Sequence, residues 1–296
     1  MATALAFQNL DNEQSHQFHA RLQHFNSFRL APGLLRPEWQ ADLRAEYNVR
    51  VEEGLFVERE RHLIQRAARD VPEQPAAFLR WFENLRECGS GQNDPLFPWL
   101  ANLATLPEMK WFLTQEAAGE AGFDDLVALT QVRFPVRAKL EMARNYWDEM
   151  GRGHERGMHG RMLEAVVREL GLEPSLDSTV WESMALSNLM AALASNRRYA
   201  YQSIGALGAI EMTAPTRVVH VNSGLKRLSV PLEARAYFQL HAGLDIQHSK
   251  AWNQEIIYSL VEADPRTARP IAEGALMRLA SGARCFQRYR VHLGLG

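Results

Sequence analysis

Hydrophobic residues recur at intervals of three and four positions along most of the chain, and this spacing places them on one face of an α-helix. A short alternating run occurs only at 218–221, Val-Val-His-Val. The pattern therefore predicts an all-α fold. The segments expected to be helical are 11–26, 37–70, 75–88, 107–132, 135–150, 155–171, 179–196, 198–213, 216–226, 231–262 and 264–290.

Proline and glycine separate these segments, and Pro215 is expected to end one helix before the next begins. The segments before about residue 105 are more charged and have smaller apolar faces than those that follow. We therefore expect one domain over 1–296, in which 1–105 form accessory N-terminal helices and 106–296 form the helical core.

Composition narrows the classes of function. The chain has 296 residues, 46% of them hydrophobic, which is enough to bury a large core. Its 33 basic and 35 acidic residues give a net charge of −2, which argues against a nucleic-acid partner. No apolar run is long enough to cross a bilayer and no signal peptide is evident, so we expect a cytoplasmic protein without a membrane partner. Cys88 and Cys285 lack the spacing of a disulfide framework or zinc site and are expected to be packing thiols.

Polar residues interrupt the apolar stripe of the helix expected over 231–262. His241, Asp245 and His248 fall within about 60° of one another on one helical face, which they share with Phe238 and Trp252. Burying an unpaired carboxylate costs several kcal/mol unless a cation or another partner neutralises it. The three residues therefore indicate a metal site; the alternatives are a solvated face or an Asp–His pair between helices.

Glu211 interrupts a second stripe, which it shares with Ile204, Leu207 and Gly208. Gly208 would let another backbone approach closely, so a glutamate on this face is hard to explain as surface. Its alternative is a charge near a helix end before Pro215.

Glu149 and His159 form a third candidate pair. In an unbroken helix they would lie about 80° apart, but the glycines between them interrupt the helix and allow both to face one centre. His154 is a competing ligand that looks more like loop surface. The alternative is a plain helix-turn-helix with the glycines Gly151, Gly153 and Gly157 in its turn.

Glu116 and Glu120 lie one helical turn apart and share a face with Phe112, Phe123 and Val127. Small residues between them leave space for a carboxylate to point into a bundle. We expect one of the two to be a metal ligand, and the alternative is a pair of exposed glutamates.

Together these segments offer carboxylates and imidazoles, without a thiolate, on four helices. That set suits iron or manganese, and its size is sufficient for two ions bridged by a carboxylate. The Glu-x-x-His pairs of ferritin-like bundles are not supported, because the one such pair is Glu13 with His16 in the N-terminal region.

The order Glu, Glu-x9-His, Glu, His-x3-Asp-x2-His resembles that of the heme-oxygenase-like diiron oxidases, often called iron-containing redox enzymes. The resemblance covers about residues 107–250, and the spacing to Glu149 favours Glu120 over Glu116 as first ligand. It implies a seven-helix heme-oxygenase-like bundle that binds two irons rather than heme. The matching residues are Glu116 or Glu120, Glu149, His159, Glu211, His241, Asp245 and His248.

The resemblance also implies chemistry. Family members include a fatty-acid decarboxylase that makes terminal alkenes, a chlorolysine-cleaving lyase and a guanidino N-oxygenase, so the fold does not fix the substrate. We expect two Fe ions (Fe2+/Fe3+), O2 as co-substrate, and a small substrate of amino-acid origin that undergoes C–H abstraction, oxidative cleavage or N-oxygenation. An external electron donor and a homodimer are compatible with it. Glu211 or Glu149 would bridge the irons, with His159, His241 and Asp245 on one and His248 on the other.

Aromatic residues near these ligands are expected to line a substrate pocket, with ordinary core packing as the alternative. They are Tyr146, Tyr237 and Phe238, together with Trp147 and Trp252. Arg144 or Arg235 could receive a substrate carboxylate, although the sequence favours surface salt bridges for both. The rival functions are a metal-independent, thiaminase-like or cofactor-independent enzyme of the same fold, a heme-binding protein, and a nonenzymatic helical interaction protein.

Overall fold

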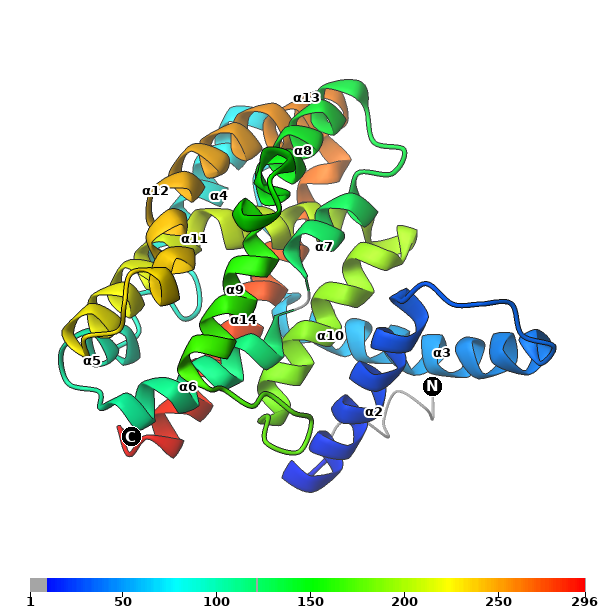
Figure 1. The fold of residues 1–296 in the computed structure, drawn as a ribbon. Coiled ribbons are helices and arrows are strands. Elements are labelled where there is room, and N and C mark those ends of the chain that lie inside the picture. The colour runs from blue at the N-terminus through cyan, green and yellow to red at the C-terminus, as the bar shows by residue number, and fades with distance from the viewer. Residues whose placement is uncertain (1–9, 121, 296) are drawn as a thin grey trace.

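The computed structural model describes residues 10–120 and 122–295, and within them the fold is all α-helical (Figure 1). No strand occurs in these residues, and the isolated bridge between Met150 and Met158 is the nearest approach to one. None of the helices described is long and apolar enough to cross a membrane. The first four helices are α2 (Asn12–Leu30), α3 (Trp39–Ile64), α4 (Pro75–Cys88) and α5 (Leu96–Asn102). The remainder are α6 (Leu106–Gly119), α7 (Phe123–Thr130), α8 (Val136–Glu149), α9 (His159–Leu170), α10 (Trp181–Ser195), α11 (Ala200–Arg227), α12 (Ala236–Ala251), α13 (Ser259–Ala263) and α14 (Ala268–His292).

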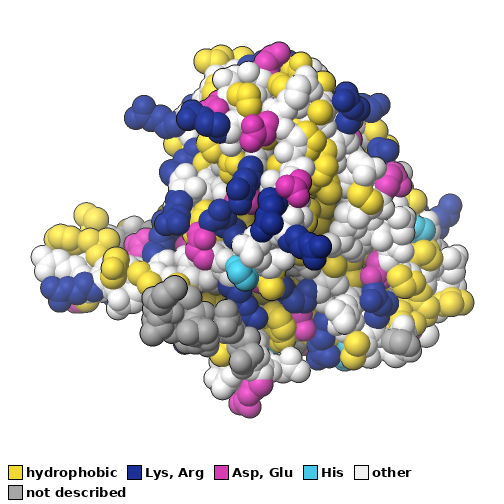
Figure 2. Space-filling view, turned by 180° about the vertical axis from the view of Figure 1, so that it is seen from behind, with side chains coloured by type: hydrophobic (Ala, Val, Ile, Leu, Met, Phe, Trp, Pro, Cys, Tyr) yellow, Lys and Arg dark blue, Asp and Glu magenta, His cyan; other side chains and the backbone are white. Residues whose placement is uncertain are grey.

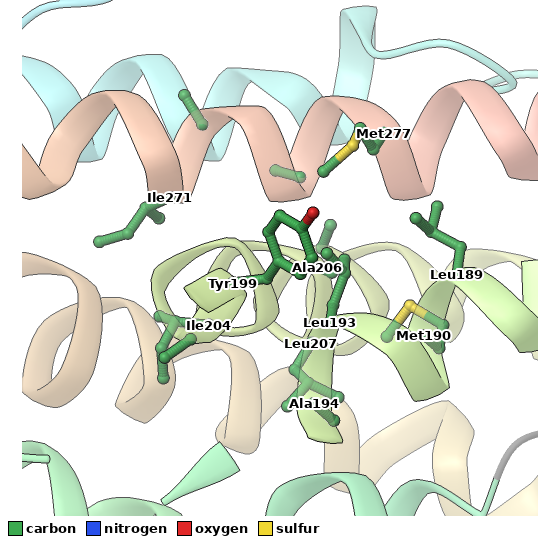
Figure 3. Packing of buried hydrophobic residues seen from close by; sticks show 14 of the residues in the cluster. Leu189, Met190, Leu193, Ala194, Tyr199, Ile204, Ala206, Leu207, Ile271 and Met277 are labelled. Carbon is green, nitrogen blue, oxygen red and sulfur yellow. The ribbon is translucent and has the colours of Figure 1, made fainter. Parts of the chain in front are cut away.

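The centre of the bundle is formed by α10, α11 and α14. Leu189 of α10, Leu207 of α11 and Ile271 of α14 are fully buried and belong to one cluster of hydrophobic side chains (Figure 3). Burying a side chain of this kind stabilises the fold by roughly 1.5–3 kcal/mol. Because α11 also packs on α12, this core fixes the position of two helices that carry predicted ligands.

The N-terminal helices pack on the outside of this core. Helix α2 contacts α10 and α3 contacts α14, and Phe18 and Phe56 join the main hydrophobic cluster. The end of this α2–α3 arm projects from the bundle (Figure 1) and carries a concentration of hydrophobic side chains (Figure 2), among them the exposed Leu34, Leu35 and Trp39. The division near residue 105 stays a prediction.

Two of the expected helix boundaries are wrong. The segment 107–132 is two helices, because Glu120 adopts an extended conformation after α6 and Gly122 the left-handed conformation before α7. Conversely, 198–213 and 216–226 form the single helix α11, which continues through Pro215. A proline removes one backbone N–H, here the donor for the carbonyl of Glu211, and the packing of α11 against α12 and α14 stabilises the helix despite this loss. The alternating run 218–221 is therefore helical.

Other differences are smaller. The segment 37–70 ends its helix at Ile64, 155–171 begins its helix at His159, and α5 was not expected because prolines surround it. The segment 231–262 is not one regular helix, since the seven residues Trp252–Tyr258 between α12 and α13 form a π-helix. Wide turns of this kind occur often at functional sites.

Candidate metal centre

The structure gathers six of the predicted ligands in the interior. Glu149 is the last residue of α8, His159 is the first residue of α9, and Glu211 lies in the middle of α11. The other three, His241, Asp245 and His248, lie on α12. Figure 1 shows α9 beside α12, and these helices are in contact. All six are buried, with exposed fractions between 2% for Glu211 and 8% for His241, so they do not form a solvated face. They are Glu149, His159, Glu211, His241, Asp245 and His248.

Five of the six form two overlapping sets with the geometry of metal-binding groups. In the first set, one nitrogen or oxygen each from Glu149, His159 and His241 lie within 4.8 Å of one another. The second set is Glu149, Glu211 and His248, with the same limit. Glu149 belongs to both, so its carboxylate lies between the two positions. Asp245 lies one turn after His241 and belongs to neither set. It lines a cavity whose wall also includes Glu149 and His241.

A tight loop brings Glu149 and His159 together. Gly151 has a φ of 60°, and a Cβ atom there would lie 2.3 Å from the carbonyl carbon of Gly157. Only glycine allows this approach, which lets residues 150 and 158 pair across the loop. The Nδ1 atom of His159 then lies 2.6 Å from Oε2 of Glu149. His154, in the same loop, is exposed.

Hydrogen bonds from neighbouring groups orient two of the imidazoles. Nδ1 of His241 donates to the carbonyl oxygen of Tyr237 over 2.7 Å, which leaves Nε2 without a proton and free to bind a cation. Nε2 of His248 donates to Oδ2 of Asp148 over 3.1 Å, which leaves Nδ1 free, 3.6 Å from Oε2 of Glu211.

Buried atoms without partners test whether this cluster fits a metal. Nδ1 of His159 makes no hydrogen bond with Glu149 despite the short distance between them, and Nδ1 of His248 is likewise buried without a hydrogen-bond partner. Buried polar atoms are nearly always hydrogen-bonded, so two unsatisfied imidazole nitrogens among carboxylates require an explanation. A cation at each set would satisfy them, and a set of carboxylates and imidazoles without thiolate suits iron. The residues present therefore fit the metal that their pattern predicts.

Burial and crowding shift the pKa values of the cluster strongly. Burial and the neighbouring Glu211 raise the pKa of both Glu149 and Asp245 to about 9. Burial lowers the pKa of His159 and His241 to about 4. Burial also lowers that of His248, but the charge of Glu211 and the hydrogen bond to Asp148 outweigh it and raise the pKa to about 9. In the metal-free cluster at neutral pH, Glu149 and Asp245 are therefore protonated, and binding of a cation would release these protons.

These shifts predict how the metal-free protein responds to alkali. A group whose pKa is higher in the folded than in the unfolded state stabilises the fold below its unfolded pKa and loses this contribution as the pH rises through its folded pKa. Between pH 6.5 and about 9, Glu149, Asp245 and His248 all act in this direction. We expect the melting temperature of the metal-free protein to fall across this range and that of the iron-loaded protein to stay nearly constant. Equal pH profiles for the two forms would contradict the expectation.

Glu120 and Glu116 occupy different places. Both side chains are exposed to a larger extent than the six buried residues, and each lines a cavity. Glu120, at the break between α6 and α7, lines the same cavity as Glu149 and His241. Glu116 lines an adjoining cavity, and its Oε1 accepts a hydrogen bond from the hydroxyl of Tyr289 over 2.9 Å.

The sequence pattern missed two residues that hold the ligands. Nδ2 of Asn145 donates to Oε1 of Glu211 over 2.6 Å. Asp148 accepts from His248 and from Nε of Arg152, and although burial raises it, these hydrogen bonds lower the pKa of Asp148 below its usual value. Both lie on the last turn of α8, within four residues of Glu149, and this proximity was the available signal.

We expect Asp148→Asn to weaken iron binding about 10- to 100-fold, because an ionised carboxylate that orients a ligating histidine also raises its basicity. Anaerobic titration with Fe2+ measures this change. Replacing Asp264, an exposed aspartate that pairs with Arg266, by asparagine provides the control. An unchanged affinity in Asp148→Asn would show that Asp148 does not support His248.

The structure separates the predicted pocket residues. Tyr237 and Phe238 line cavities next to the ligands, whereas Tyr146 packs against the main hydrophobic cluster and Trp147 is 53% exposed. Trp252 is buried and donates from Nε1 to the carbonyl of Ile204. Neither arginine considered as a carboxylate receptor lines these cavities. Arg144 is exposed and pairs with Glu141, and Arg235 bonds the side chain of Asn222 and the carbonyl of Val230.

A family model matches residues 110–283, and its description is iron-containing redox enzyme. This match covers more than half of the chain and includes every predicted ligand. The chain belongs to the iron-containing redox enzyme family. The resemblance stated from the ligand order is thus confirmed, as is the all-α, heme-oxygenase-like fold. Membership in the iron-containing redox enzymes makes the protein an oxidoreductase. No curated protein matches the chain.

Proposed function

We propose that this protein is a non-heme diiron enzyme that activates O2 and oxidises a small organic substrate. The observation that carries the proposal is that two buried ligand sets share one carboxylate, Glu149. A single metal would need only one set, and a heme would need one axial histidine and a broad apolar cleft. Two positions joined by a carboxylate are typical of diiron centres.

The geometry supports a division of the ligands. His159 and His241 would bind one iron, His248 and Glu211 the other, and Glu149 would bridge them. We assign Asp245 to the first iron, since it lines the cavity beside His241, and Glu120 as the further carboxylate of the centre. Glu116 is left without a ligand role. Bound ferrous ions would supply the electrons for reducing O2, and an external donor would restore them.

The protein's own residues contribute orientation and shelter. Asn145 fixes the carboxylate of Glu211 through its hydrogen bond, and Asp148 and the carbonyl of Tyr237 fix the two imidazoles of α12. The cavity beside the ligands has a volume of about 150 Å3. Leu163, Met190 and Ile210 form part of its wall and make much of that wall apolar. Apolar walls limit the access of water to the reacting groups.

Iron analysis tests the proposal directly. The protein is loaded with Fe2+ without oxygen, freed of unbound metal and assayed for iron, with about two irons per chain expected. Mixing this protein with O2 in a stopped-flow instrument, against a panel of amino acids and fatty acids, then identifies the compound that accelerates a visible transient. A chain that retains no iron would favour the thiaminase-like or nonenzymatic alternative, and a Soret band on adding heme would favour heme binding.

A further inference from the structure

A second cavity adjoins the ligand cavity. It also has a volume of about 150 Å3, and the two share wall residues that include Glu120, Ile210, Tyr237 and Arg278. The shared walls place the two cavities next to each other, one at the ligand cluster and the other toward α6 and α14. We call them the ligand chamber and the second chamber. The wall of the second chamber is mostly apolar and includes Phe97, Phe112, Leu113, Leu172, Val221 and Phe238.

Two arginines line the second chamber. They are Arg217 on α11 and Arg278 on α14, and Arg278 lines the ligand chamber as well. Neither forms a salt bridge or a side-chain hydrogen bond with the residues that the structure describes, and Nε of Arg278 is buried without a partner. The guanidinium carbon of Arg217 lies 5.5 Å from the ring centre of Phe286. Burial lowers the pKa of Arg217 to about 9 and lowers that of Arg278.

Nearby carboxyl groups in the described part of the chain form no ion pair with the two arginines. Glu116 and Glu120 also line the second chamber, and their charges act on the arginines, but both lie beyond ion-pair distance, and Oε1 of Glu116 accepts a hydrogen bond from Tyr289. Both arginine side chains are partly buried, and such a charge without an ion pair is costly unless a partner compensates it. An anion from outside the chain would be such a partner.

We propose that Arg217 and Arg278 bind the carboxylate of the substrate and direct its carbon chain into the ligand chamber. The identification of this anion as the substrate rests on the proposed function, whereas the binding of an anion by the two arginines does not. Planar guanidinium groups bind carboxylates with paired hydrogen bonds, and the apolar wall suits a hydrocarbon body. Glu116 in the same chamber disfavours a phosphate dianion by repulsion, so a monocarboxylate is the better match.

The chambers also limit the size of this acid. A cavity of 150 Å3 holds a molecule of about the size of benzene, so the two chambers together hold a short or medium-length acid. With its carboxylate at the arginines, the carbons several bonds away would lie nearest His159, His241 and Asp245, which line the ligand chamber. The carboxylate would thus be an anchor away from the metals.

Binding measurements test the anchor. Straight-chain carboxylic acids of increasing length, their primary amides and their α-amino counterparts are titrated by calorimetry into iron-loaded protein without oxygen. We expect the acids to bind at least about tenfold more tightly than the amides. The α-amino series distinguishes an amino-acid substrate, for which Glu116 would accept the ammonium group, from a fatty acid. Equal affinity for acids and amides would overturn the proposal.

Variants locate the site. Arg217→Gln and Arg278→Gln should each weaken acid binding about 10- to 100-fold and leave amide binding and the iron content unchanged. Arg278→Lys keeps the positive charge but cannot form the paired hydrogen bonds of a guanidinium group, so it should bind acids more tightly than Arg278→Gln and less tightly than the parent. Arg235→Gln, outside the two chambers, is the control, and its melting temperature and those of the variants report folding. Unchanged acid binding in both Arg→Gln variants would also overturn the proposal.

The two proposals fail in different ways. If the chain retains no iron but the arginine variants still lose acid binding, the diiron function is wrong and the anion site stands. If two irons bind but acids show no preference over amides, the metal centre stands and the anchor is wrong.

Discussion

The Glu149→Gln protein is expected to bind at most one iron per chain in place of two, and its O2 consumption with substrate should fall at least about 100-fold. Glu149 is the residue common to both ligand sets, and an amide offers one neutral oxygen where a carboxylate offers two charged ones. Iron analysis after anaerobic loading and desalting measures the first effect. Oxygen uptake measures the second.

The stability of the metal-free variant distinguishes the loss of a bridging carboxylate from misfolding. Glu149 must take up a proton when the metal-free protein folds at pH 8, and glutamine needs none, so the metal-free variant should be more stable than the metal-free parent by roughly 2 kcal/mol at this pH. Glu182→Gln is the matched control, because Glu182 is a buried carboxylate on α10 outside both sets. Two tightly bound irons in Glu149→Gln would exclude a bridging role.

The Gly205→Ala protein is expected to lose about 3–5 kcal/mol of its free energy of unfolding, equivalent to a fall of roughly 10 °C in melting temperature. A Cβ atom at Gly205 would lie 1.8 Å from the carbonyl oxygen of Ile271, so the backbones of α11 and α14 would have to move apart. Because backbone cannot give way as a flexible side chain can, the cost is large. Chemical denaturation of the metal-free protein measures it.

Gly54→Ala is the control for this substitution. Gly54 lies inside α3 with nothing within 4 Å of the added carbon, so alanine there should stabilise the protein by up to about 1 kcal/mol through its helix propensity. Similar losses in both variants would show that the crossing of α11 and α14 is not tightly packed. A shift of α11 would also displace Glu211, so iron affinity should fall in Gly205→Ala alone.

The helices and the ligand cluster were largely predictable because both follow from periodicity. The spacing of His241, Asp245 and His248 places them on one face of a helix whatever that helix packs against. The glycines after Glu149 predict a turn before His159. A buried carboxylate needs a partner in any fold. These local rules explain why separate segments indicated a common centre.

Features that depend on packing between distant segments were not predictable. Pro215 was expected to end a helix, but the contacts of α11 with its neighbours outweigh one lost hydrogen bond. Asn145 and Asp148 look like ordinary polar residues until α11 and α12 bring Glu211 and His248 to them. The role of Arg278 could not be predicted from the sequence, because this residue comes to line the second chamber only through the packing of α14 on the other helices.

The π-helical turn after α12 has an evolutionary consequence. A wide turn holds one residue more than an α-helical turn, so it absorbs an additional residue while the helices on both sides keep the directions of a continuous α-helix. Deleting one residue there would return the segment to an α-helix, whereas deleting one residue between His241 and His248 would rotate one of them away from the other by about 100°. Loss of a single codon between positions 252 and 258 should therefore be tolerated better than loss of a codon inside α12.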